Sequence, residues 1–482
     1  MKFYLTTAIP YVNAAPHLGF ALELVQADVF ARWRKQKGDD VRFVTGTDDN
    51  ALKNVLSAEE AGVPVGEFVA RNAEKFRALK DPLALSFNDF ISTTEERHVR
   101  GAQRFWEACR KDIYEKEYRG LYCVGCEEFK TEKELVDDRC PEHPNMKLEE
   151  VEEKNYFFKL TNYEEQLKKL IVSGKLLITP ETRKNEVLSF VEGGLHDFSI
   201  SRSVKRAKGW GIPVPDDPSQ VMYVWFDALT NYVNALGYAD DGELFKKYWQ
   251  ENEDILHVIG KGVSRFHAVY WPAMLLSAGL RLPRTIFVHG YLTVDGKKIS
   301  KSLGNVVDPF ALVKKYGTDA VRYYLLREIP TGEDGDFSEE KFRERYNGDL
   351  ANGLGNFASR ILALASKAGD LDGGKKLDSK VAAKIEEIRT HVNAKIEDFK
   401  LHEALTHLWE LIAFGDGYVN EKKPWENHDP QVLFELVVIL DNVAALLQPF
   451  LPETAEKITS SIEWSGNVLK VKKGEVLFPR LS

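Results

Sequence analysis

The feature that most limits how this chain can fold is the order of apolar segments in its first 45 residues. Residues 3–7 are rich in β-formers, and Pro10 and Pro16 end that run. Apolar side chains then recur at helical spacing over 21–37, a glycine follows, and a second β-rich run covers 41–45. This strand–turn–helix–strand order predicts the start of a parallel α/β sheet.

Two later stretches depart from that order. Cysteines, charges and prolines crowd residues 119–148, which indicates an insertion. After about residue 340 the pattern turns helical, with helices expected at 350–365, 379–396, 402–418 and 432–447 and a loop at 369–377. A chain of 482 residues suggests two to four domains, and we expect the last of them to be a helical bundle.

Charge narrows the choice of partners. The 65 Lys and Arg residues against 74 Asp and Glu give a net charge of −9, which argues mildly against a nucleic-acid partner, because phosphate contacts need local positive charge. One local exception is a possible basic strip formed by Arg202, Lys205, Arg206 and Lys208. A solvated charged turn is an equally good interpretation of this strip.

Composition also bears on the compartment. The N-terminus has no long apolar stretch, and no run of about 18 apolar residues occurs, so we expect neither a secretory signal nor a membrane span. Four cysteines do not make a secreted disulfide scaffold. We therefore expect a cytoplasmic protein.

The most specific short motif is a pair of knuckles, Cys123-x-x-Cys126 followed after thirteen residues by Cys140-x-x-His143. Three sulfurs and one nitrogen in two chelating pairs are typical of tetrahedral zinc. The alternative is two disulfides, which would leave His143 without a role and would need an oxidising compartment. Four filled positions leave no open one, so we expect one structural Zn²⁺. Cys109 remains and is expected to be a small buried side chain.

The strand-to-helix turn Pro16-His17-Leu18-Gly19 has the composition of a phosphate-binding segment. Free backbone N–H groups and the positive end of the helix dipole suit a phosphate at such a turn. His17 can donate a hydrogen bond to a phosphate oxygen, and Gly19 would let a nucleotide approach the backbone closely. Alone, a His-x-Gly sequence is more often incidental.

A second loop of this kind covers residues 295–302, with the sequence DGKKISKS. Its lysines and serines can close over a triphosphate and neutralise charge that develops on phosphorus. In isolation a lysine run is more often a solvated basic loop. Neither a Walker-type loop nor a G-x-G-x-x-G sequence occurs, which argues against a P-loop ATPase and a dehydrogenase.

Together the two loops resemble a known pair. His17-Leu-Gly resembles the HIGH signature of class I aminoacyl-tRNA synthetases, and Lys298-Ile-Ser-Lys-Ser resembles their KMSKS signature, in the expected order and at a fitting separation. Nearly the whole chain is similar to the methionine members of this class. The stretches that carry this likeness are 8–13 (AIPYVN), 43–48 (FVTGTD), 223–228 (YVWFDA), 266–273 (FHAVYWPA), 423–425 (KPW) and 477–480 (LFPR).

The resemblance implies an α/β fold: a Rossmann-like parallel-sheet catalytic domain with a zinc-bearing insertion, followed by an all-α anticodon-binding bundle. The implied parts are a first catalytic half (1–116), the insertion (117–222), a second catalytic half (223–290), a KISKS-loop connector (291–345) and the anticodon-binding domain (346–482). The implied activity is ATP-dependent activation of L-methionine to methionyl-adenylate and its transfer to tRNA(Met). ATP would enter with Mg²⁺, and we expect a monomer.

The resemblance also assigns residues to the small substrates. The methionine pocket would be lined by Ile9, Tyr11, Asp48, Trp225, Tyr232 and His267. Aromatic faces suit a thioether, and Asp48 would accept a charge-assisted hydrogen bond from the substrate ammonium. The catalytic residues would be His17, Lys298 and Lys301, and ATP would also contact Gly19 and Ser300.

For tRNA, the resemblance gives the anticodon role to Asn356, Arg360 and Trp425. Asn356 and Arg360 are four residues apart, so both project from one face of a helix. A tryptophan can stack an unpaired base, while asparagine and arginine can read base edges.

Three positions depart from the family pattern. Phe20 stands at the fourth position of the HIGH motif, 49–51 (DNA) replaces an acidic-His-Gly sequence, and Gly262 stands where aspartate is common. These positions bear on the rate and on the exact substrate, but leave the fold and the chemistry class unchanged.

Two alternatives remain open. One is a class I ligase for leucine, isoleucine or valine, whose large editing domain is a poor fit to an insertion of about a hundred residues. The other, motivated by these departures, is a synthetase-like paralogue that binds tRNA or another RNA without efficient aminoacylation.

Overall fold

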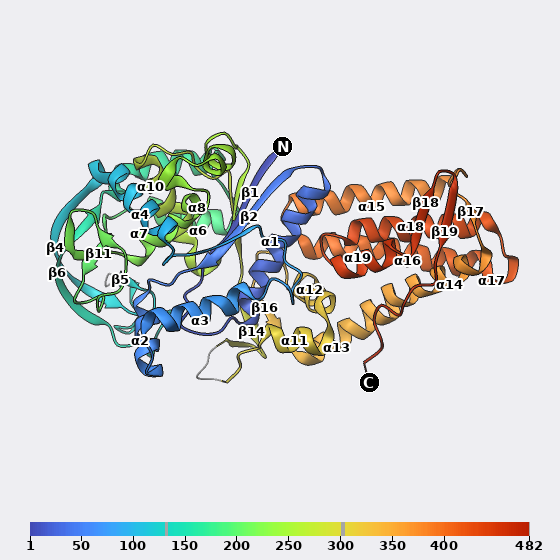
Figure 1. Cartoon of the computed structure of the whole chain (residues 1–482), viewed down its shortest axis with the longest axis horizontal. Helices are drawn as coiled ribbons and strands as arrows, with labels where there is room; N and C mark the ends of the chain where they lie inside the picture. Colours follow the sequence, from blue (N-terminus) through green and yellow to red (C-terminus); the bar gives the residue numbers. More distant parts are fainter. Residues whose placement is uncertain (131–133, 300–303, 482) are drawn as a thin grey trace. The chain divides into compact units, whose positions relative to one another are not determined.

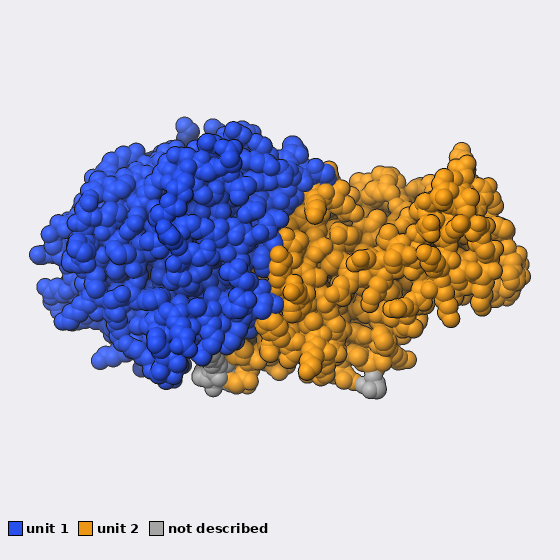
Figure 2. All heavy atoms as spheres, viewed as in Figure 1, with its two compact units in different colours: residues 1–16, 38–78, 87–288 blue, residues 17–37, 79–86, 289–482 orange. Residues whose placement is uncertain are grey.

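The computed structural model describes residues 1–130, 134–299 and 304–481, and the chain forms two compact units (Figure 2). Unit 1 comprises 1–16, 38–78 and 87–288, and unit 2 comprises 17–37, 79–86 and 289–482. The first helix of the chain is thus grouped with the C-terminal residues rather than with the strands on either side of it.

A six-stranded sheet is the centre of unit 1 (Figure 1). Its order is β3-β2-β1-β12-β13-β7, with bounds Asp89–Ser92, Asp40–Thr47, Lys2–Thr7, Ile255–Gly260, Thr285–His289 and Leu177–Thr179. β1 pairs in parallel with both β2 and β12, so the strand order reverses at β1. Open α/β sheets bind ligands at such a switch point, outside the carboxyl ends of the strands. The predicted parallel α/β sheet is confirmed.

Aromatic side chains fill the core of unit 1. Phe105 of α4 (Glu96–Cys109) stacks on Trp271 at the start of α10 (Trp271–Ser277), with ring centroids 5.6 Å apart. Phe226 of α7 (Val224–Leu229) packs edge-on against Trp106 at 5.2 Å. Cys109 is buried, as expected, and burial raises its pKa to about 12. The other α-helices of six or more residues in this unit are α2 (Leu52–Ala61), α3 (Val65–Arg77), α5 (Glu164–Val172) and α6 (Glu181–Glu192).

The region expected as an insertion is built on a long antiparallel pair, β4 (Ile113–Cys123) and β6 (Glu149–Phe158). β5 (Glu128–Lys130) and β8 (Phe198–Ser199) extend it in the order β5-β4-β6-β8. A second small sheet contains β10 (Pro213–Val214), β11 (Asp217–Met222) and β9 (Ser201–Ser203). β7 also falls within 117–222, so that range supplies an edge strand of the main sheet as well.

Three side chains of the possible basic strip form ion pairs within unit 1. Arg202 is buried and pairs with Glu127 at 3.1 Å. Arg206 lies within 3.5 Å of Glu153, and Lys208 forms an ion pair with Glu59. Because carboxylates of unit 1 already pair with these three side chains, the structure favours a charged structural turn over a nucleic-acid surface at this strip.

Unit 2 is mostly helical. α14, α15, α16 and α18 pack together as a bundle (Figure 1). The α-helices of this unit are α1 (Leu18–Gln36), α11 (Pro309–Tyr316), α12 (Thr318–Arg327), α13 (Glu339–Arg345), α14 (Asn356–Ala368), α15 (Ser379–Glu397), α16 (Leu401–Lys422), α17 (Pro424–Asn427), α18 (Pro430–Leu447) and α19 (Pro452–Thr459). Aspartate side chains at 378 and 429 cap the first turns of α15 and α18.

Two details of the helical part differ from expectation. The helix expected at 350–365 begins at Asn356, after a π-helical stretch, Tyr346–Gly355. The loop expected at 369–377 contains β17 (Leu371–Asp372), which pairs with β19 (Val468–Val471) beside β18 (Ile462–Ser465). The bundle therefore carries a small sheet and is not purely helical. Strands of two to four residues are too short to show a period of two.

One helix of the described residues, α18, is long and apolar enough to cross a membrane by length and composition alone. Its mean hydropathy is 1.7 over 18 residues, although Gln431, Glu435, Asp441 and Asn442 interrupt its apolar side chains. However, 61% of that segment is buried inside the structure, as in the core helix of a bundle. Its acidic Glu435 is buried and accepts a hydrogen bond from Tyr418 of the neighbouring α16.

α1 is anchored within unit 2 by a fully buried arginine. Arg322 of α12 lies 2.8 Å from Asp28 of α1. Its guanidinium also donates to the carbonyl oxygens of Leu83, Pro449 and Phe450 at 2.9, 3.0 and 2.7 Å. One cation therefore holds α1, the 79–86 segment and the turn after α18 together.

Candidate functional site

The carboxyl ends of β1 and β2 bring the first site residues together in unit 1. Tyr11 and Asp48 form an isolated parallel bridge, and the Asp48 amide donates to the Pro10 carbonyl at 2.9 Å. The Asp48 side chain is 1% exposed, and it accepts a hydrogen bond of 3.1 Å from the amide of Asn50. Ile9 lies half-buried in the same exit segment of β1. A buried carboxylate at the switch point can receive a cationic group.

Aromatic rings form the wall that accompanies Asp48. Trp225 stacks on Phe266 with ring centroids 3.8 Å apart and planes 4° apart. Its ring also contacts Tyr11 at 6.2 Å and His267 at 6.4 Å, both edge to face. Phe266 was not among the predicted site residues, although it lies in one of the family-like stretches. The hydroxyl of Tyr11 and the indole Nε1 of Trp225 are buried, and neither has a hydrogen-bond partner among the described residues.

His267 is neutral in this wall. Its Nδ1 lies 2.9 Å from the Val263 carbonyl, which can only accept, so the ring proton is on Nδ1. Nε2 then accepts the hydroxyl proton of Tyr232 at 2.6 Å. Burial lowers the pKa of His267 to about 4, which agrees with this tautomer. A wall of neutral rings suits an uncharged, polarisable side chain.

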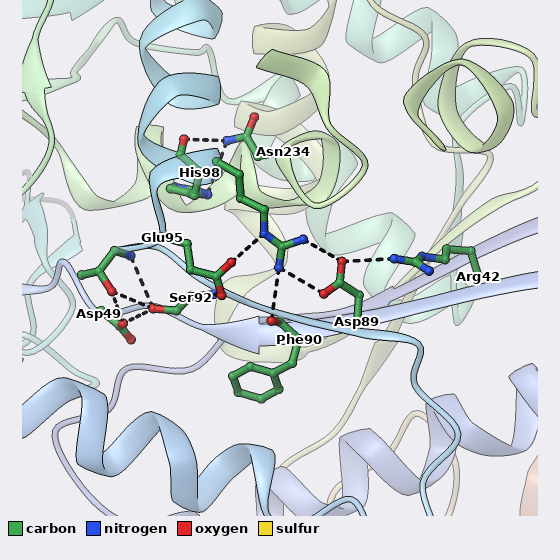
Figure 3. Close-up of polar contacts among 10 residues, drawn as sticks. Arg42, Asp49, Asp89, Phe90, Ser92, Glu95, His98 and Asn234 are labelled. Carbon is green, nitrogen blue, oxygen red and sulfur yellow. Dashed lines mark hydrogen bonds and ion pairs between the residues drawn. The ribbon is translucent and has the colours of Figure 1, made fainter. Parts of the chain in front are cut away.

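A group of buried polar residues lies behind Asp48, and most of them were not predicted (Figure 3). Asp49 accepts hydrogen bonds from the hydroxyls of Ser92 and Thr94 at the end of β3. His98 of α4 lies beside Asn234 of α8 (Asn231–Asn234). The start of α4 is held by Arg97, which donates to both carboxylate oxygens of Asp89 at 2.8 and 3.0 Å.

Asp227 completes this group and is fully buried on α7. The one signal in the sequence was an acidic residue inside an otherwise apolar run, 223–229. Its partners come from distant segments, so the sequence could not identify them.

In unit 2, His17 caps the first turn of α1. Its Nδ1 accepts a hydrogen bond of 3.1 Å from the amide of Gly19, so in the neutral ring Nε2 carries the proton and can donate. Burial lowers the pKa of His17, which favours this neutral form. A Cβ atom at position 19 would lie 3.0 Å from the His17 ring, which gives a local reason for glycine there. The first turn of α1 contains no acidic residue, as an anion site requires.

The KISKS segment begins on a hairpin of unit 2. β14 (Leu292–Val294) pairs with β15 (Lys297–Lys298) through a two-residue turn in which Asp295 and Gly296 have φ values of 49° and 73°, and β16 (Gly335–Phe337) lies on the other side of β14. A Cβ atom at Gly19 would lie 3.9 Å from Ile299, and the Leu18 amide donates to the Val307 carbonyl at 3.1 Å. The described residues on either side of 300–303 therefore lie beside the first turn of α1.

Three of the predicted ATP contacts fall on residues or side chains that the structure does not describe. Ser300 and Lys301 lie outside the described residues, as does the side chain of Lys298.

The knuckle residues of unit 1 converge into one cluster. Sγ of Cys126 lies 3.4 Å from Sγ of Cys140 and 3.3 Å from Nδ1 of His143, and Cys123 Sγ lies 3.9 Å from that nitrogen. All four ligand atoms lie within 4.8 Å of one another, so the group could hold a metal ion. The three thiols are free, and the disulfide alternative is not formed. A Cβ atom at Gly125 would overlap the His143 ring at 2.3 Å, so glycine is needed inside the first knuckle.

Two of the three predicted anticodon residues meet on the helical part of unit 2. The Arg360 guanidinium lies over the Trp425 ring, 4.6 Å from its centroid, and donates to Asn420 Oδ1 at 2.9 Å. Trp425 on α17 is 39% exposed, which is unusual for so large an apolar ring. Asn356, the first residue of α14, is exposed one helical turn before Arg360. This face offers an aromatic ring and polar side chains to solvent.

Known proteins match the whole chain. A family model described as tRNA synthetases class I (M) matches residues 3–150 and 142–362, and one described as the anticodon-binding domain of tRNA ligase matches 378–476. The methionine–tRNA ligase of Thermotoga maritima is 42% identical over 476 residues, which covers 95% of this chain and 75% of that protein. The enzyme of Clostridium acetobutylicum is 41% identical over 514 residues, covering 100% of this chain and 78% of its own.

A solved structure agrees with these matches. Methionyl-tRNA synthetase of Mycobacterium tuberculosis in complex with methionyl-adenylate aligns with a TM-score of 0.92 and 39% identity, over 99% of this chain and 100% of that one. Family models, relatives and fold thus agree over nearly the full length. This chain belongs to the methionine–tRNA ligase family of the class I aminoacyl-tRNA synthetases.

Proposed function

We propose that this chain ligates methionine to tRNA(Met) in two steps. First, a carboxylate oxygen of methionine attacks the α-phosphorus of ATP, and pyrophosphate leaves. Second, the terminal ribose hydroxyl of the tRNA attacks the carbonyl carbon of methionyl-adenylate, and AMP leaves. The observation that carries this proposal is the buried carboxylate of Asp48 at the switch point, beside a wall of neutral aromatic rings.

The pocket assigns a role to each predicted methionine residue. Asp48 accepts the ammonium group, because a buried carboxylate is stabilised by a charge-assisted hydrogen bond. The thioether packs against Tyr11, Trp225 and the hydrogen-bonded pair of Tyr232 and His267. Ile9 adds apolar surface at the exit of β1.

ATP is proposed to lie against the two loops of unit 2. His17 donates from Nε2 to a phosphate oxygen, and the first turn of α1 after Gly19 offers its free amides. Lys298, Ser300 and Lys301 neutralise the charge that develops on the transferred phosphorus. The reaction needs no protein nucleophile, because positioning and charge stabilisation suffice. Mg²⁺ enters with ATP as its counter-ion.

Zinc is proposed at the Cys123, Cys126, Cys140 and His143 cluster. In a tetrahedral zinc site with bonds of about 2.3 Å, ligand atoms lie roughly 3.8 Å apart. The observed separations of 3.3 to 3.9 Å fit that geometry. Four protein ligands leave no open position, so the ion is structural. Metal analysis of protein purified without chelator should find one zinc per chain, and its loss in Cys126→Ser; a protein without zinc would refute the assignment.

For tRNA, we propose that Trp425 stacks an unpaired anticodon base, while Arg360 and Asn356 read its edges. The anticodon-binding part is assigned to 346–482, after the KISKS connector at 291–345. Residues 1–116 and 223–290 are assigned to the catalytic fold, with 117–222 between them. We further propose a monomer of the cytoplasm, which light scattering and cell fractionation would test.

The deciding experiment is ATP–pyrophosphate exchange with each of the twenty amino acids, followed by aminoacylation of a tRNA with the CAU anticodon. Exchange with methionine alone, and charging of that tRNA, is the expected result. Exchange driven by leucine, isoleucine or valine would point to another class I ligase. Tight tRNA binding without any exchange would identify an RNA-binding paralogue.

A further inference from the structure

A second buried carboxylate lies close to the proposed ammonium site. Asp227 is fully buried, and its Oδ2 accepts a hydrogen bond of 3.3 Å from the side-chain amide of Asn50. The backbone amide of the same Asn50 donates to Asp48 at 3.1 Å. Oδ1 of Asp227 has no hydrogen-bond partner among the described residues. One residue thus links both carboxylates, and one carboxylate oxygen remains unpaired.

The imidazole nearest to Asp227 has a fixed orientation. Nδ2 of Asn234 lies 3.4 Å from Nδ1 of His98 and 3.3 Å from its carbonyl oxygen (Figure 3). An amide nitrogen can only donate, so Nδ1 of His98 accepts and, in the neutral ring, Nε2 carries the proton. That nitrogen is 3.8 Å from Oδ1 of Asp227, too far for a hydrogen bond. His98 therefore faces Asp227 without satisfying it.

Most of the charge around the pair is negative. The titratable groups near Asp48 and Asp227 are Asp49, Glu127, His98, Arg202 and Tyr11, and the Lys53 ammonium lies over the Tyr11 ring, 5.4 Å from its centroid. Arg202 is already paired with Glu127 at 3.1 Å. Asp48, Asp49 and Asp227 are all at most 1% exposed, and the His98 imidazole lies near Asp49 and Asp227 only. Three buried carboxylates cannot all ionise beside so little positive charge.

Electrostatics agree with this arrangement. Burial raises the pKa of Asp48 well above its ordinary value, and the charge of Asp227 raises it further. Burial also raises the pKa of Asp227, while His98 lowers it. A proton held between these carboxyl groups relieves their repulsion until a cation arrives.

We propose that Asp227 is a positioning residue for the methionine ammonium group: in the free enzyme it shares a proton with Asp48, and the incoming ammonium displaces that proton to water. One O–H bond breaks, the proton passes to solvent, and the ammonium keeps its three protons. This inference rests on the proposed function, because methionine is the cation that replaces the proton.

The sign of the pH dependence follows from linkage. The bound ammonium stabilises the ionised pair, so the pKa of the pair is lower in the complex than in the free enzyme. Between these two pKa values, binding releases a proton, and the Kd for methionine rises as pH falls, by up to about tenfold per pH unit. Above both pKa values the Kd no longer depends on these groups.

The first test uses the unmodified full chain. Calorimetric titration with L-methionine, in buffers of different ionisation enthalpy over roughly pH 5 to 8, should show binding enthalpies that depend on the buffer. The buffer dependence gives the number of protons released, which should approach one per site. Methionine binding with no buffer dependence anywhere in that range would overturn the inference without any variant.

The second test uses Asp227→Asn, which keeps the shape and removes the charge. The rise in Kd for methionine should move to lower pH, and proton release near neutral pH should fall. The matched control is Asp49→Asn, an equally buried carboxylate whose Oδ2 accepts hydrogen bonds from both Ser92 and Thr94 but whose Oδ1 is unpaired among the described residues, like that of Asp227. Because the Asn50 side chain bonds to Asp227, Asp49→Asn should shift the profile less. A wild-type pH profile in folded Asp227→Asn would contradict the proposal.

A ligand without the amino group separates positioning from structure. 4-(Methylthio)butanoate should bind wild type and Asp227→Asn with equal affinity, because it carries no ammonium. Equal losses for this ligand and for methionine would indicate a purely structural role. If methionine neither binds nor drives pyrophosphate exchange, the proposed function itself fails; exchange without proton release defeats only this inference.

Discussion

The proposed methionine pocket and the proposed anticodon face each contain a tryptophan, but in opposite settings. Trp225 stacks on Phe266 within unit 1. Its indole Nε1 is buried and unpaired among the described residues, as is Oδ1 of Asp227. Trp425 in unit 2 is 39% exposed and rests on the Arg360 guanidinium. A small zwitterion must lose its water, so its site supplies charge from inside the protein. A nucleic-acid base offers a flat face, so its site needs only an exposed ring in a fixed orientation.

The two settings also predict different energies. Solvent weakens the interactions of buried charges only little. A base that stacks on an exposed ring, by contrast, replaces a contact that the ring already makes with water. Substitutions in the pocket should therefore have larger effects than substitutions on the anticodon face, and each should leave the other activity intact.

The largest effect is expected for Asp48→Ala. Removing one partner of a buried, hydrogen-bonded charge pair costs about 2–5 kcal/mol, or a factor of roughly 30 to several thousand in kcat/KM for methionine. Pyrophosphate exchange measures this loss, and tRNA affinity by filter binding should stay unchanged. If tRNA binding fell equally, the contrast between the two sites would be broken.

Lys301→Ala should come next. Loss of one preorganised charge contact slows adenylate formation by a factor on the order of 10² to 10³. Single-turnover kinetics should show this in the rate rather than in methionine affinity. An unchanged exchange rate would show that the KISKS assignment is wrong.

Trp425→Ala should weaken discrimination among tRNAs by about 1–3 kcal/mol, the scale of one base–aromatic stack. The measurement compares kcat/KM for tRNAs with CAU and altered anticodons. Methionine-dependent exchange serves as the control and should be unaffected. A variant that lost both activities would be misfolded and would say nothing about stacking.

The smallest effect is expected for Asn420→Ala. Its side chain accepts a hydrogen bond of 2.9 Å from Arg360, so its loss should free the guanidinium beneath Trp425. One such hydrogen bond contributes about 0.5–1.5 kcal/mol. Combining Asn420→Ala with Arg360→Ala should add no further loss in tRNA charging; additive losses would mean that Asn420 contacts the tRNA independently.

Local spacing predicted the parts of the sites that lie close together in sequence. The knuckles at Cys123 and Cys140 are each chelating pairs, so their convergence needed one turn of the chain. The approach of Ile299 to Gly19 was predictable only because both loops resemble a known pair. The aromatic wall was also predicted only from the family resemblance. Without it, a ring such as Trp225 could not be told from an ordinary core side chain.

Contacts between residues far apart in the chain could not be predicted from the sequence. Arg202 belongs to a basic cluster in the sequence, but in the structure it forms an ion pair with Glu127, which lies far earlier in the chain. Asp227 and His98 are brought together by two helices that no local pattern relates. The two-residue strand β17 is a strand only because it pairs with β19, which lies almost a hundred residues later in the chain.

The buried Arg322 has a consequence for dissection of this enzyme. A fragment ending at residue 345 would retain His17 and the KISKS loop, yet would lack the carbonyl acceptors of Pro449 and Phe450. Asp28 and the Leu83 carbonyl would remain as partners of Arg322, but two of its three carbonyl acceptors would be gone. A hydrogen bond to a charged group contributes about 1.5–3 kcal/mol, a large share of the stability of a typical domain. The helices beyond 345 thus help to hold α1, which carries the proposed nucleotide-binding turn, in addition to their proposed role in tRNA binding. Order along the chain is therefore a poor guide to where this protein can be cut.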